Sequence, residues 1–467
     1  MTGVQTCALP ICFPVTISDS GGVATANAGG TYALTPSLAT GGTFTSSNYS
    51  ITYVAGALTV NKATLTVTAD NKSRVYGDSN PSLSYTIAGY VNSENASSAG
   101  ITGAPTISTT ATAASNVADY TITSAANNLA ASNYQFSYVD GTLTVNRRPV
   151  TVTADNKSRE YGASNPSLTY TIAADGTGTS RGMYSSETLT GSVATAAVAT
   201  TSVGSVSITQ NTSTNANNAN YDITYNNGTL SITQKALTIT ANNGSKTYGG
   251  TNTYGSGSTA FTSSGLANSE TIGSVTITDT NSGGVATANA GGTYALTPSL
   301  ATGGTFTSSN YSITYVAGAL TVNQKALTIT SDAQSTTYGT ALSLGTSGFT
   351  SSGLVNSDSI TSVTLKQATN TTVPATQSAG TYSGSTDGIL ASAAQGTGLS
   401  NYSITYAPVT LTINQKALTI TANNGSKTYG GTNTYGSGST AFTSSGLVNS
   451  ETISSIVTGK QIGRAHV

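Results

Sequence analysis

Apolar and hydroxyl-bearing residues alternate along short stretches of the chain, and the same stretches return at regular intervals. Leu237 and Ile239 alternate with Thr238 and Thr240, and residues 49–53 alternate tyrosine and isoleucine with serine and threonine. A period of two is typical of a strand that buries one face and exposes the other. No stretch of the sequence sustains a period of 3.6 residues, so the pattern predicts a chain built of short strands.

An opening motif marks each repeat of this pattern. In its fullest form it is Lys-Ala-Leu-Thr-Ile at 235–239, followed by Lys-Thr-Tyr-Gly at 246–249. The Tyr-Gly pair recurs at spacings of 85, 87, 90 and 91 residues, beginning at Tyr76, Tyr161, Tyr248, Tyr338 and Tyr429. A near-constant period of this length indicates tandem copies of one small domain.

A closing motif, Asn-Tyr-x-Ile-Thr-Tyr in its fullest form, ends each copy. It or its counterpart begins at Asn48, Asn133, Asn220, Asn310 and Asn401. Asp140-Gly141 and Asn227-Gly228 follow it and predict two-residue hairpins, because a type I′ turn needs positive φ at both positions. Ala407-Pro408 stands there in the last complete copy and predicts a different turn. The motif's first tyrosine, at a strand entrance, is a candidate for a tyrosine corner.

These patterns together predict an all-β chain, a tandem array of small Ig-like β-sandwich domains with six or seven strands each. The alternative is an array of β-grasp-like repeats, which a helix at residues 265–270 would favour. We expect complete repeats at 62–146, 147–234, 235–324 and 325–415, with partial repeats at 13–61 and 416–460. Because so few residues separate one repeat from the next, we also expect a semi-rigid rod.

The two ends of the sequence differ from the repeats. Residues 1–12 hold both cysteines, Cys7 and Cys12, and residues 461–467 hold the lone histidine, His466. Both segments resemble the translation of a short-read sequencing adapter, taken from opposite strands, so we exclude them from the fold. Taken at face value, the two cysteines would suggest a disulfide or half a metal site, which we do not predict.

Composition narrows the classes of function. Charged residues make up 7% of the chain, and 16 basic residues nearly balance 17 acidic ones. This leaves no basic patch for nucleic acid, and no apolar run approaches the roughly 20 residues that span a bilayer. Outside the excluded ends the chain has neither cysteine nor histidine, the usual members of nucleophile–base pairs. We therefore predict no enzyme, no cofactor and no catalytic, cofactor-binding or metal-binding residues.

One acidic residue recurs in register with a lysine at the start of each repeat. The positions are Glu94, Glu187, Glu270, Asp358 and Glu451. A Lys–Asn isopeptide bond with this acid as proton shuttle is one hypothesis, but Arg148 stands at the lysine's place in one repeat. We favour a solvated turn acid that can pair with a lysine. Asp70-Asn71 and Asp155-Asn156 offer calcium one carboxylate each, fewer than it usually takes.

The 25 tyrosines of the chain are candidates for an aromatic platform that binds sugars. Most of them alternate with isoleucine and leucine, which predicts that they lie in the core. Tyr184 and Tyr254 fall outside this alternation and are the better candidates for exposed contacts.

Some copies are nearly identical although they are not neighbours. Residues 21–61 are identical to residues 283–323, and residues 234–272 match residues 415–453 with one change, Ala267 to Val448. Differences between adjacent copies lower the risk of misfolding by strand exchange. We favour recent block duplication, or an assembly error, as the origin of the identical copies.

The opening and closing motifs together resemble the MBG domain of the YGX type, over nearly all of residues 13–456. Such domains occur in tandem in large bacterial surface adhesins, including filamentous-haemagglutinin-like proteins. The resemblance implies a secreted or cell-surface location, associated with the outer membrane, and a non-catalytic stalk or adhesion role. The implied partners are glycans or proteins on host or neighbouring cells. The alternative is a multivalent array of ligand-binding modules, which a hydroxyl-rich patch recurring in every repeat would favour.

Overall fold

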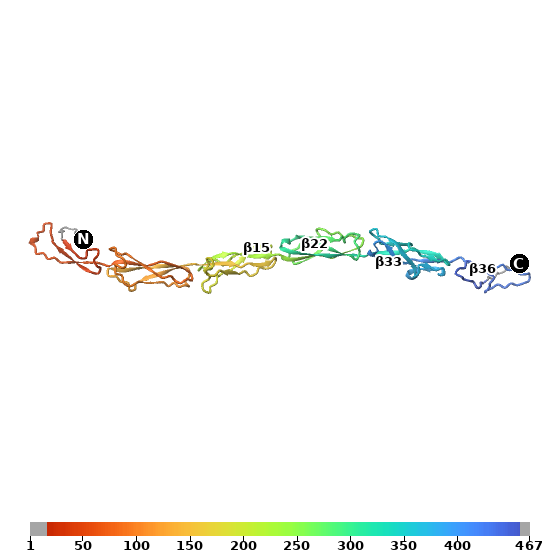
Figure 1. Cartoon of the computed structure of the whole chain (residues 1–467), viewed down its shortest axis with the longest axis horizontal. Helices are drawn as coiled ribbons and strands as arrows, with labels where there is room; N and C mark the ends of the chain where they lie inside the picture. Colours follow the sequence, from red (N-terminus) through yellow and green to blue (C-terminus); the bar gives the residue numbers. More distant parts are fainter. Residues whose placement is uncertain (1–15, 458–467) are drawn as a thin grey trace, which may run out of the picture. The chain divides into compact units, whose positions relative to one another are not determined.

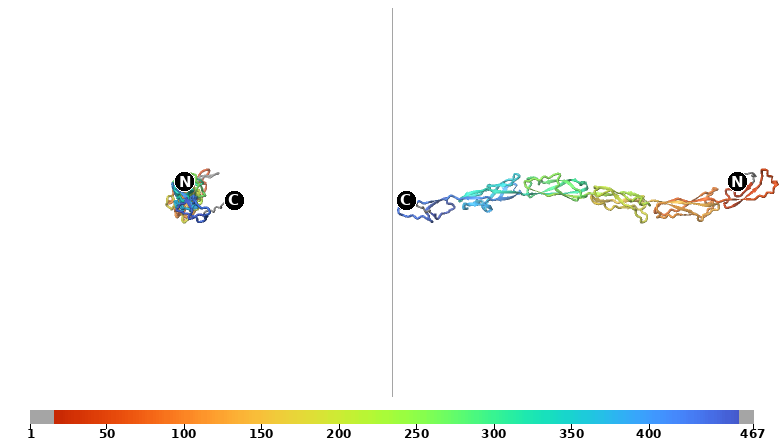
Figure 2. Two further views of the ribbon diagram at one scale, coloured as in Figure 1. Left: turned by 90° about the vertical axis from the view of Figure 1, so that its right-hand side faces the viewer. Right: turned by 180° about the vertical axis from the view of Figure 1, so that it is seen from behind.

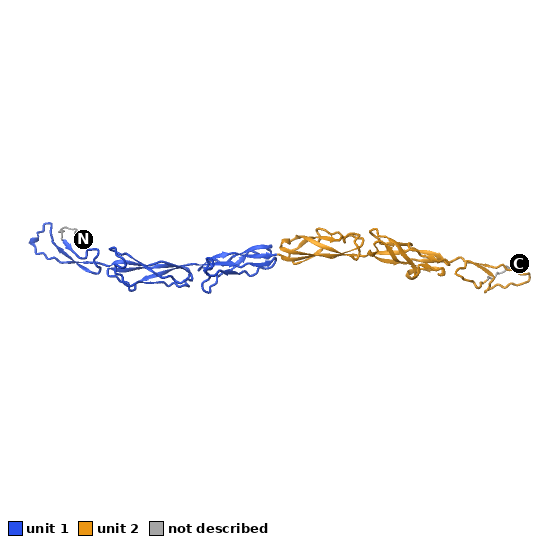
Figure 3. Ribbon diagram, viewed as in Figure 1, with its two compact units in different colours: residues 1–233 blue, residues 234–467 orange. Residues whose placement is uncertain are grey.

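The computed structural model describes residues 16–457, so the interpretation of residues 1–12 and 461–467 lies outside the described part. The chain divides into two compact units, residues 1–233 and residues 234–467, and each is described by itself (Figure 3). Strands dominate both units (Figure 1). Among residues 16–457, no helix has the length and apolar character needed to cross a membrane.

The repeat at residues 62–146 shows the architecture most simply. It has two sheets, one of three strands in the order β6-β4-β9 and one of four in the order β5-β10-β8-β7. The strands are β4 (Ala63–Ala69), β5 (Lys72–Val75), β6 (Tyr85–Ala88), β7 (Thr106–Ser108), β8 (Asp119–Ala125), β9 (Tyr134–Val139) and β10 (Gly141–Asn146). This repeat is the orange part of the ribbon, seen from opposite sides in Figure 1 and in the right-hand view of Figure 2.

The first two strands of this repeat pair in parallel with the last two. β4 pairs with β9 from Ala63↔Tyr134 to Thr68↔Val139, and β5 pairs with β10 in the other sheet. Because the last strand runs in the same direction as the first, the chain enters the repeat at one end and leaves it at the other. One residue, Arg147, separates β10 from the first strand of the next repeat.

The predicted alternation of buried and exposed positions is confirmed. Leu65 and Val67 of β4, Ile122 of β8, and Leu143 and Val145 of β10 are all buried between the sheets. Burying one such side chain contributes about 1.5–3 kcal/mol, and the threonines between them face outward or lie at the margin.

The other complete repeat of the first unit has the same arrangement, with sheets β13-β11-β16 and β12-β17-β15-β14. Its strands are β11 (Arg148–Ala154), β12 (Lys157–Glu160), β13 (Tyr170–Ile172), β14 (Val193–Thr195), β15 (Gly204–Gln210), β16 (Tyr221–Asn226) and β17 (Gly228–Thr233).

The predicted hairpins at Asp140-Gly141 and Asn227-Gly228 are wrong. The strands on either side of each pair lie in different sheets, and neither glycine has a positive φ. A Cβ on Gly141 would lie 2.4 Å from the carbonyl oxygen of Ala69. Glycine is needed there because the backbones approach closely where the chain crosses between sheets, and not because a turn requires positive φ.

The second unit contains two further complete repeats. The first has β18 (Lys235–Ala241), β19 (Gly244–Thr247), β20 (Phe261–Ser264), β21 (Ile272–Thr280), β22 (Thr293–Gly304), the 3-10 helix η2 (Ser308–Asn310), β23 (Tyr311–Val316) and β24 (Gly318–Asn323). Residues 265–270 form a loop with a turn and no helix, so the sandwich is confirmed over the β-grasp alternative.

In the last complete repeat the second sheet is divided into smaller ones, β26-β34-β31, β27-β30 and β29-β32. This repeat contains β25 (Lys325–Ser331), β26 (Gln334–Thr337), β27 (Leu342–Ser343), β28 (Phe349–Ser352), β29 (Ile360–Gln367), β30 (Thr372–Val373), β31 (Gly380–Tyr382), α1 (Gly384–Asp387), β32 (Ile389–Gly396), η3 (Leu399–Asn401), β33 (Tyr402–Ala407) and β34 (Leu411–Asn414). Three residues, 408–410, separate the two closing strands of this repeat, whereas a single residue separates them in the other complete repeats. The connection at Ala407-Pro408 therefore differs from the others, as predicted.

Each unit also contains part of a repeat. Residues 16–61 form β1 (Thr16–Ser18), β2 (Thr31–Ser37), η1 (Ser46–Asn48) and β3 (Gly56–Thr59). Residues 416–457 form β35 (Thr419–Ala422) and β36 (Phe442–Ser445), which pair with each other.

Candidate functional site at the repeat junctions

The recurring acidic residue lies at the contact between neighbouring repeats of a unit and binds two tyrosine hydroxyls. In the first unit, Tyr76 donates a hydrogen bond of 2.6 Å to Oε1 of Glu187, and Tyr221 donates to Oε2. In the second unit, Tyr248 and Tyr402 donate to Oδ2 of Asp358 over 2.9 and 2.8 Å. One tyrosine belongs to the Tyr-Gly motif of the preceding repeat and the other to the acid's own repeat. We call this set the tyrosine–carboxylate clamp.

The tyrosine from the acid's own repeat is the first tyrosine of the closing motif. Its hydroxyl also accepts a backbone N–H from the loop that carries the acid, which is Tyr184 N–H for Tyr221 and Val355 N–H for Tyr402. These loop residues lie 37 and 47 positions upstream, so the hydroxyl does not form the local bond of a tyrosine corner. It fixes the acid loop against the sheet and so positions the carboxylate for the preceding repeat.

The glycine of the Tyr-Gly motif makes room for the next repeat. Gly77 has φ +85° and Gly249 has φ +83°, in the left-handed region that favours glycine. A Cβ on Gly77 would lie 2.5 Å from the ring of Tyr184, and one on Gly249 would lie 2.6 Å from a methyl group of Val355. The motif therefore combines a hydroxyl that reaches the neighbour with a backbone on which the neighbour rests.

The cationic residue two positions before each of three motif tyrosines is buried and supports the turn. Lys246 Nζ donates to the carbonyl oxygens of Gly250 and Val285. Arg74 and Arg159 donate to the carbonyl oxygens of Thr112 and Val198, which stand at the place of Val285 in their own repeats. Burial lowers the pKa of Lys246. The cation thus holds the Tyr-Gly turn inside its own repeat and does not cross the junction.

Asparagine side chains add further bonds across the junctions. Asn220 accepts the backbone N–H of Val117 at 3.0 Å and donates to the side chain of Asn116 at 2.9 Å. Asn401 repeats both contacts with residues 289 and 290 in the second unit. In these two repeats the asparagine that opens the closing motif is therefore a junction residue.

The junction in the first unit also carries ion pairs. Asp78 lies 3.4 Å from Arg148 and 2.9 Å from Arg181 of the next repeat. The buried Arg148 guanidinium also donates to the carbonyl oxygens of Tyr76 and Gly182, one on each side of the junction. The arginine at the expected lysine position is thus a bridging group.

The clamp hydroxyls lie in a poorly hydrated setting. Burial, and after it the hydrogen bond to Glu187, raises the pKa of Tyr76 to about 12. Burial also raises the pKa of Tyr402 to about 12, with Asp358 adding to the effect. The tyrosine rings pack edge to face, with centroids 5.8 Å apart for Tyr76 and Tyr221. Neutral hydroxyls that donate to a carboxylate form charge-assisted hydrogen bonds.

At the junction with each partial repeat, the described residues supply one of the two tyrosines that bind the acid in the complete clamp. Glu94 accepts from Tyr134 at 2.5 Å, and Asn92 donates to the carbonyl oxygen of Ala24. Glu451 accepts from Tyr338, and Asn449 donates to the carbonyl oxygen of Ala375.

These contacts revise the predictions for single residues. The acid does lie in a turn, and at Glu187 and Asp358 it binds tyrosine hydroxyls, where we had allowed for a lysine. Lys62 donates to the carbonyl oxygen of Ala131. Tyr184 packs on Tyr76 within the junction, so it is not an exposed contact residue. Asp70 and Asp155 accept hydroxyl bonds from Ser84 and Thr169.

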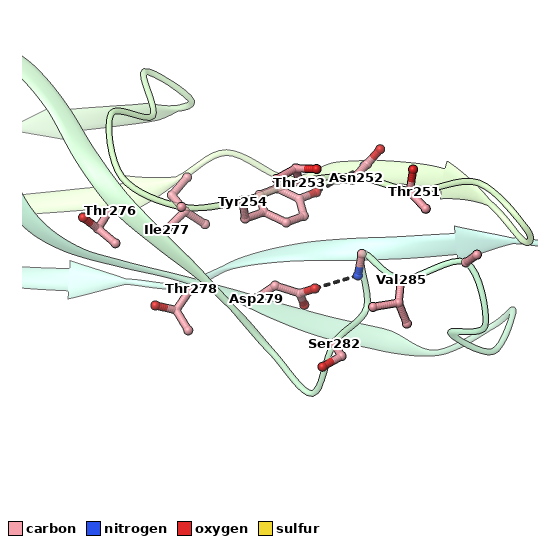
Figure 4. Close-up of a pocket in the computed structure, with 13 residues that line it drawn as sticks. Thr251, Asn252, Thr253, Tyr254, Thr276, Ile277, Thr278, Asp279, Ser282 and Val285 are labelled. Atoms are coloured by element: carbon pink, nitrogen blue, oxygen red, sulfur yellow. Dashed lines mark hydrogen bonds between the residues drawn. The ribbon is translucent and has the colours of Figure 1, made fainter.

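Tyr254 lines a groove on the flank of its repeat, together with Asp279, Thr278 and Asn252 (Figure 4). The Asp279 carboxylate accepts the backbone N–H groups of Gly283 and Gly284 at 2.9 and 2.6 Å. The Tyr254 hydroxyl accepts from Asn252 at 3.2 Å. Asp279 and Tyr254 thus already have partners within the protein. Among residues 16–457, no cluster of three or more His, Cys, Asp or Glu residues could hold a metal ion.

Comparisons with known proteins agree with the repeat pattern. The model of the MBG domain (YGX type) matches residues 65–144, 150–231, 237–321 and 327–412. No curated protein matches the chain. Among solved structures, Drosophila N-cadherin EC1-4 is 11% identical, with 64% of this chain and 83% of that chain covered and a TM-score of 0.22. The N-terminal four Ig domains of Dscam1 isoform 9.44 are 12% identical, with 64% and 79% covered and a TM-score of 0.15. The TM-scores are too low to support an argument. The four family matches show that this chain belongs to the MBG domain (YGX type) family.

Proposed function

We propose that this chain is a non-catalytic stalk and adhesion region of a large surface-exposed bacterial protein. The observation that carries the proposal is the tyrosine–carboxylate clamp, which joins complete repeats within each unit. A chain selected only for independent binding modules has no need of a clamp at each junction. A spacer has this need, because its reach depends on how its repeats are held against one another.

Two further features support a spacer. The parallel pairing of first and last strands sends the chain from one end of each repeat to the other. Single residues such as Arg147 and Gln324 connect the repeats, too few for a flexible linker. On this basis we propose semi-rigid repeats that hold a distal part away from the cell. We place the chain outside the cell, associated with the outer membrane, with glycans or proteins of host or neighbouring cells as partners.

The alternative, a multivalent array of weak binding sites, requires a site that recurs. The acid of the groove beside Tyr254 does not recur in the next repeat, where the buried Gln367 stands at the place of Asp279. Variation at this place favours the spacer.

The test is made in the producing bacterium. One strain lacks residues 235–324, and a second carries an unrelated β-sandwich of similar length in their place. A spacer predicts that adhesion falls in the first strain and returns in the second, with the repeats accessible to protease on intact cells. Loss of adhesion in both strains would favour ligand binding by the repeat, and inaccessibility to protease would contradict the surface location.

A further inference from the structure

Two parallel ladders join the beginning of each complete repeat directly to its end. In the repeat at residues 147–234, β11 pairs with β16 in one sheet and β12 pairs with β17 in the other. β11 leads into β12 through residues 155–156, and β16 leads into β17 through Asn227 alone. The ladders run from Arg148↔Tyr221 to Thr153↔Asn226 and from Lys157↔Leu230 to Glu160↔Thr233. The first and last segments of the repeat therefore lie side by side in both sheets, and the paired strands point in the same direction.

The same two ladders are present in all four complete repeats, with the same number of paired residues. Six residue pairs join β4 to β9, β18 to β23 and β25 to β33, as they join β11 to β16. Four residue pairs join β5 to β10, β19 to β24 and β26 to β34, as they join β12 to β17. The segment between the ladders varies. Within residues 62–415, all of which the structure describes, the helix α1 and the pair β27-β30 occur in the last complete repeat and in none of the other three.

The direction of the strands decides how these ladders respond to tension. Because the chain enters a repeat at one end and leaves it at the other, a pull between the ends draws β11 toward its N-terminus and β17 toward its C-terminus. This load acts along paired parallel strands, so it stretches all the hydrogen bonds of a ladder together. A load that separates two strands at one end breaks the same bonds one after another. The varied strands β13, β14 and β15 lie outside the direct path of the load.

The ladders are also shielded from water on their inner side. Val152 of β11 and Leu230 of β17 are fully buried in the core. A backbone hydrogen bond holds more firmly where water cannot replace it. The Tyr161 N–H donates to the carbonyl oxygen of Thr233 at 2.9 Å, which extends the ladder to the point where the chain leaves the repeat.

We propose that the two parallel ladders of each complete repeat form a mechanical lock that carries tension along the chain. Each repeat resists a pull between its two ends much more strongly than a pull of the same size in another direction. The source of the tension rests on the proposed stalk function, in which a distal part is held by another cell. The lock itself is a property of each repeat and can be measured on the purified chain.

The experiment is single-molecule force spectroscopy of the full chain, with Cys7 and Cys12 replaced by serine and handles attached to two introduced cysteines. The variant Arg147→Cys with Gln234→Cys is pulled along the ladders. The variant Arg147→Cys with Ala219→Cys is pulled apart at the end where β11 and β16 both begin. All three positions are exposed and lie outside the strands. Equal hydrogen-exchange protection of β11 and β17 in the two variants is the control that both have the same fold and stability.

Roughly four or more hydrogen bonds share the load in the first variant, and about one bears it at a time in the second. We therefore expect the unfolding force at equal pulling speed to be roughly fourfold higher in the first variant. The gain in length identifies each event, because the residues between the handles extend by about 3.3–3.6 Å each.

The repeat at residues 235–324 provides a second comparison with ladders of the same register. There Gln234→Cys with Gln324→Cys is compared with Gln234→Cys with Ser309→Cys, again at exposed positions. The same ratio of forces is expected. Equal forces in the two directions in either repeat, or a lower force along the chain, would overturn the lock. That result would not bear on the stalk, which the adhesion of the strain lacking residues 235–324 tests separately.

Discussion

Replacing Tyr76 with phenylalanine removes one hydroxyl from the junction of the first unit and keeps the ring. The ring's contacts with Tyr184 and Tyr221 remain, so the loss is the 2.6 Å bond to Glu187. A hydrogen bond to a charged group contributes about 1.5–3 kcal/mol when it is shielded from water. Glu187 stays partly in water and keeps the bond from Tyr221, so we expect a loss of about 1–2 kcal/mol in junction stability.

Hydrogen exchange followed by mass spectrometry measures this loss locally. Opening of the junction exposes the Val117 amide, which donates to Asn220 of the next repeat, so peptides covering residues 113–119 report on it. A loss of about 1–2 kcal/mol increases their exchange rate roughly 5- to 30-fold, while β15 and β17 keep their protection. Tyr225→Phe is the control, because its hydroxyl is buried without a hydrogen-bond partner in the described part of the chain.

A double-mutant cycle of Tyr76→Phe and Glu187→Gln then isolates the interaction energy between Tyr76 and Glu187 from the effect of each change on its other neighbours. We expect a coupling free energy of about 1 kcal/mol between the two changes. Exchange that is unchanged in Tyr76→Phe, or that rises equally in every strand of the repeat, would refute the reasoning that this hydroxyl couples neighbouring repeats.

Three further outcomes follow from the geometry. Gly249→Ala should destabilise its junction by about 2–4 kcal/mol in denaturant titrations, because the new methyl group both clashes with Val355 and strains the left-handed backbone. Gly430→Ala, which has open space around its Cβ, should cost only the backbone strain, about 1–2 kcal/mol measured locally by hydrogen exchange. Tyr315→Phe should lower the free energy of unfolding by about 1 kcal/mol, because the Ala301 N–H loses its acceptor, while Tyr225→Phe should be neutral or stabilising in the same titration. Folding raises the pKa of Tyr402 from 10.0 to about 12, so the stability that its neutral hydroxyl contributes is complete below pH 10 and is lost as pH rises to 12. Denaturation midpoints should therefore fall between pH 10 and 12, and equal midpoints at pH 9 and 12 would contradict this.

The alternation of residues was sufficient to predict strands because each sheet buries one face. Leu237 and Ile239 therefore locate a strand without any knowledge of their partners. The Gly141 prediction failed because a glycine required for close backbone approach has the same sequence signature as one required for a turn. Only the three-dimensional pairing of β4, β9 and β10 separates the two causes.

The clamp could not be predicted from local sequence. Glu187 binds Tyr221, 34 residues away in the same repeat, and Tyr76, 111 residues away in the preceding repeat. A signal was nevertheless present, because the acid and both tyrosines recur in register. Their joint recurrence indicates a shared role, but the contact itself depends on how one repeat meets the next. Charge alone favours a lysine as the acid's partner, whereas the buried tyrosine hydroxyls that bind it become apparent only when two repeats are in contact.

The central claim is that neighbouring repeats of a unit are held in one arrangement by the clamp. Electron paramagnetic resonance distances between spin labels at the exposed residues Thr86 and Thr171, with Cys7 and Cys12 replaced by serine, test it most directly. The account predicts one narrow distance distribution, which broadens when Tyr76→Phe and Glu187→Gln are introduced together. A distribution that is already broad with the clamp intact would show that the repeats move independently and would contradict the account.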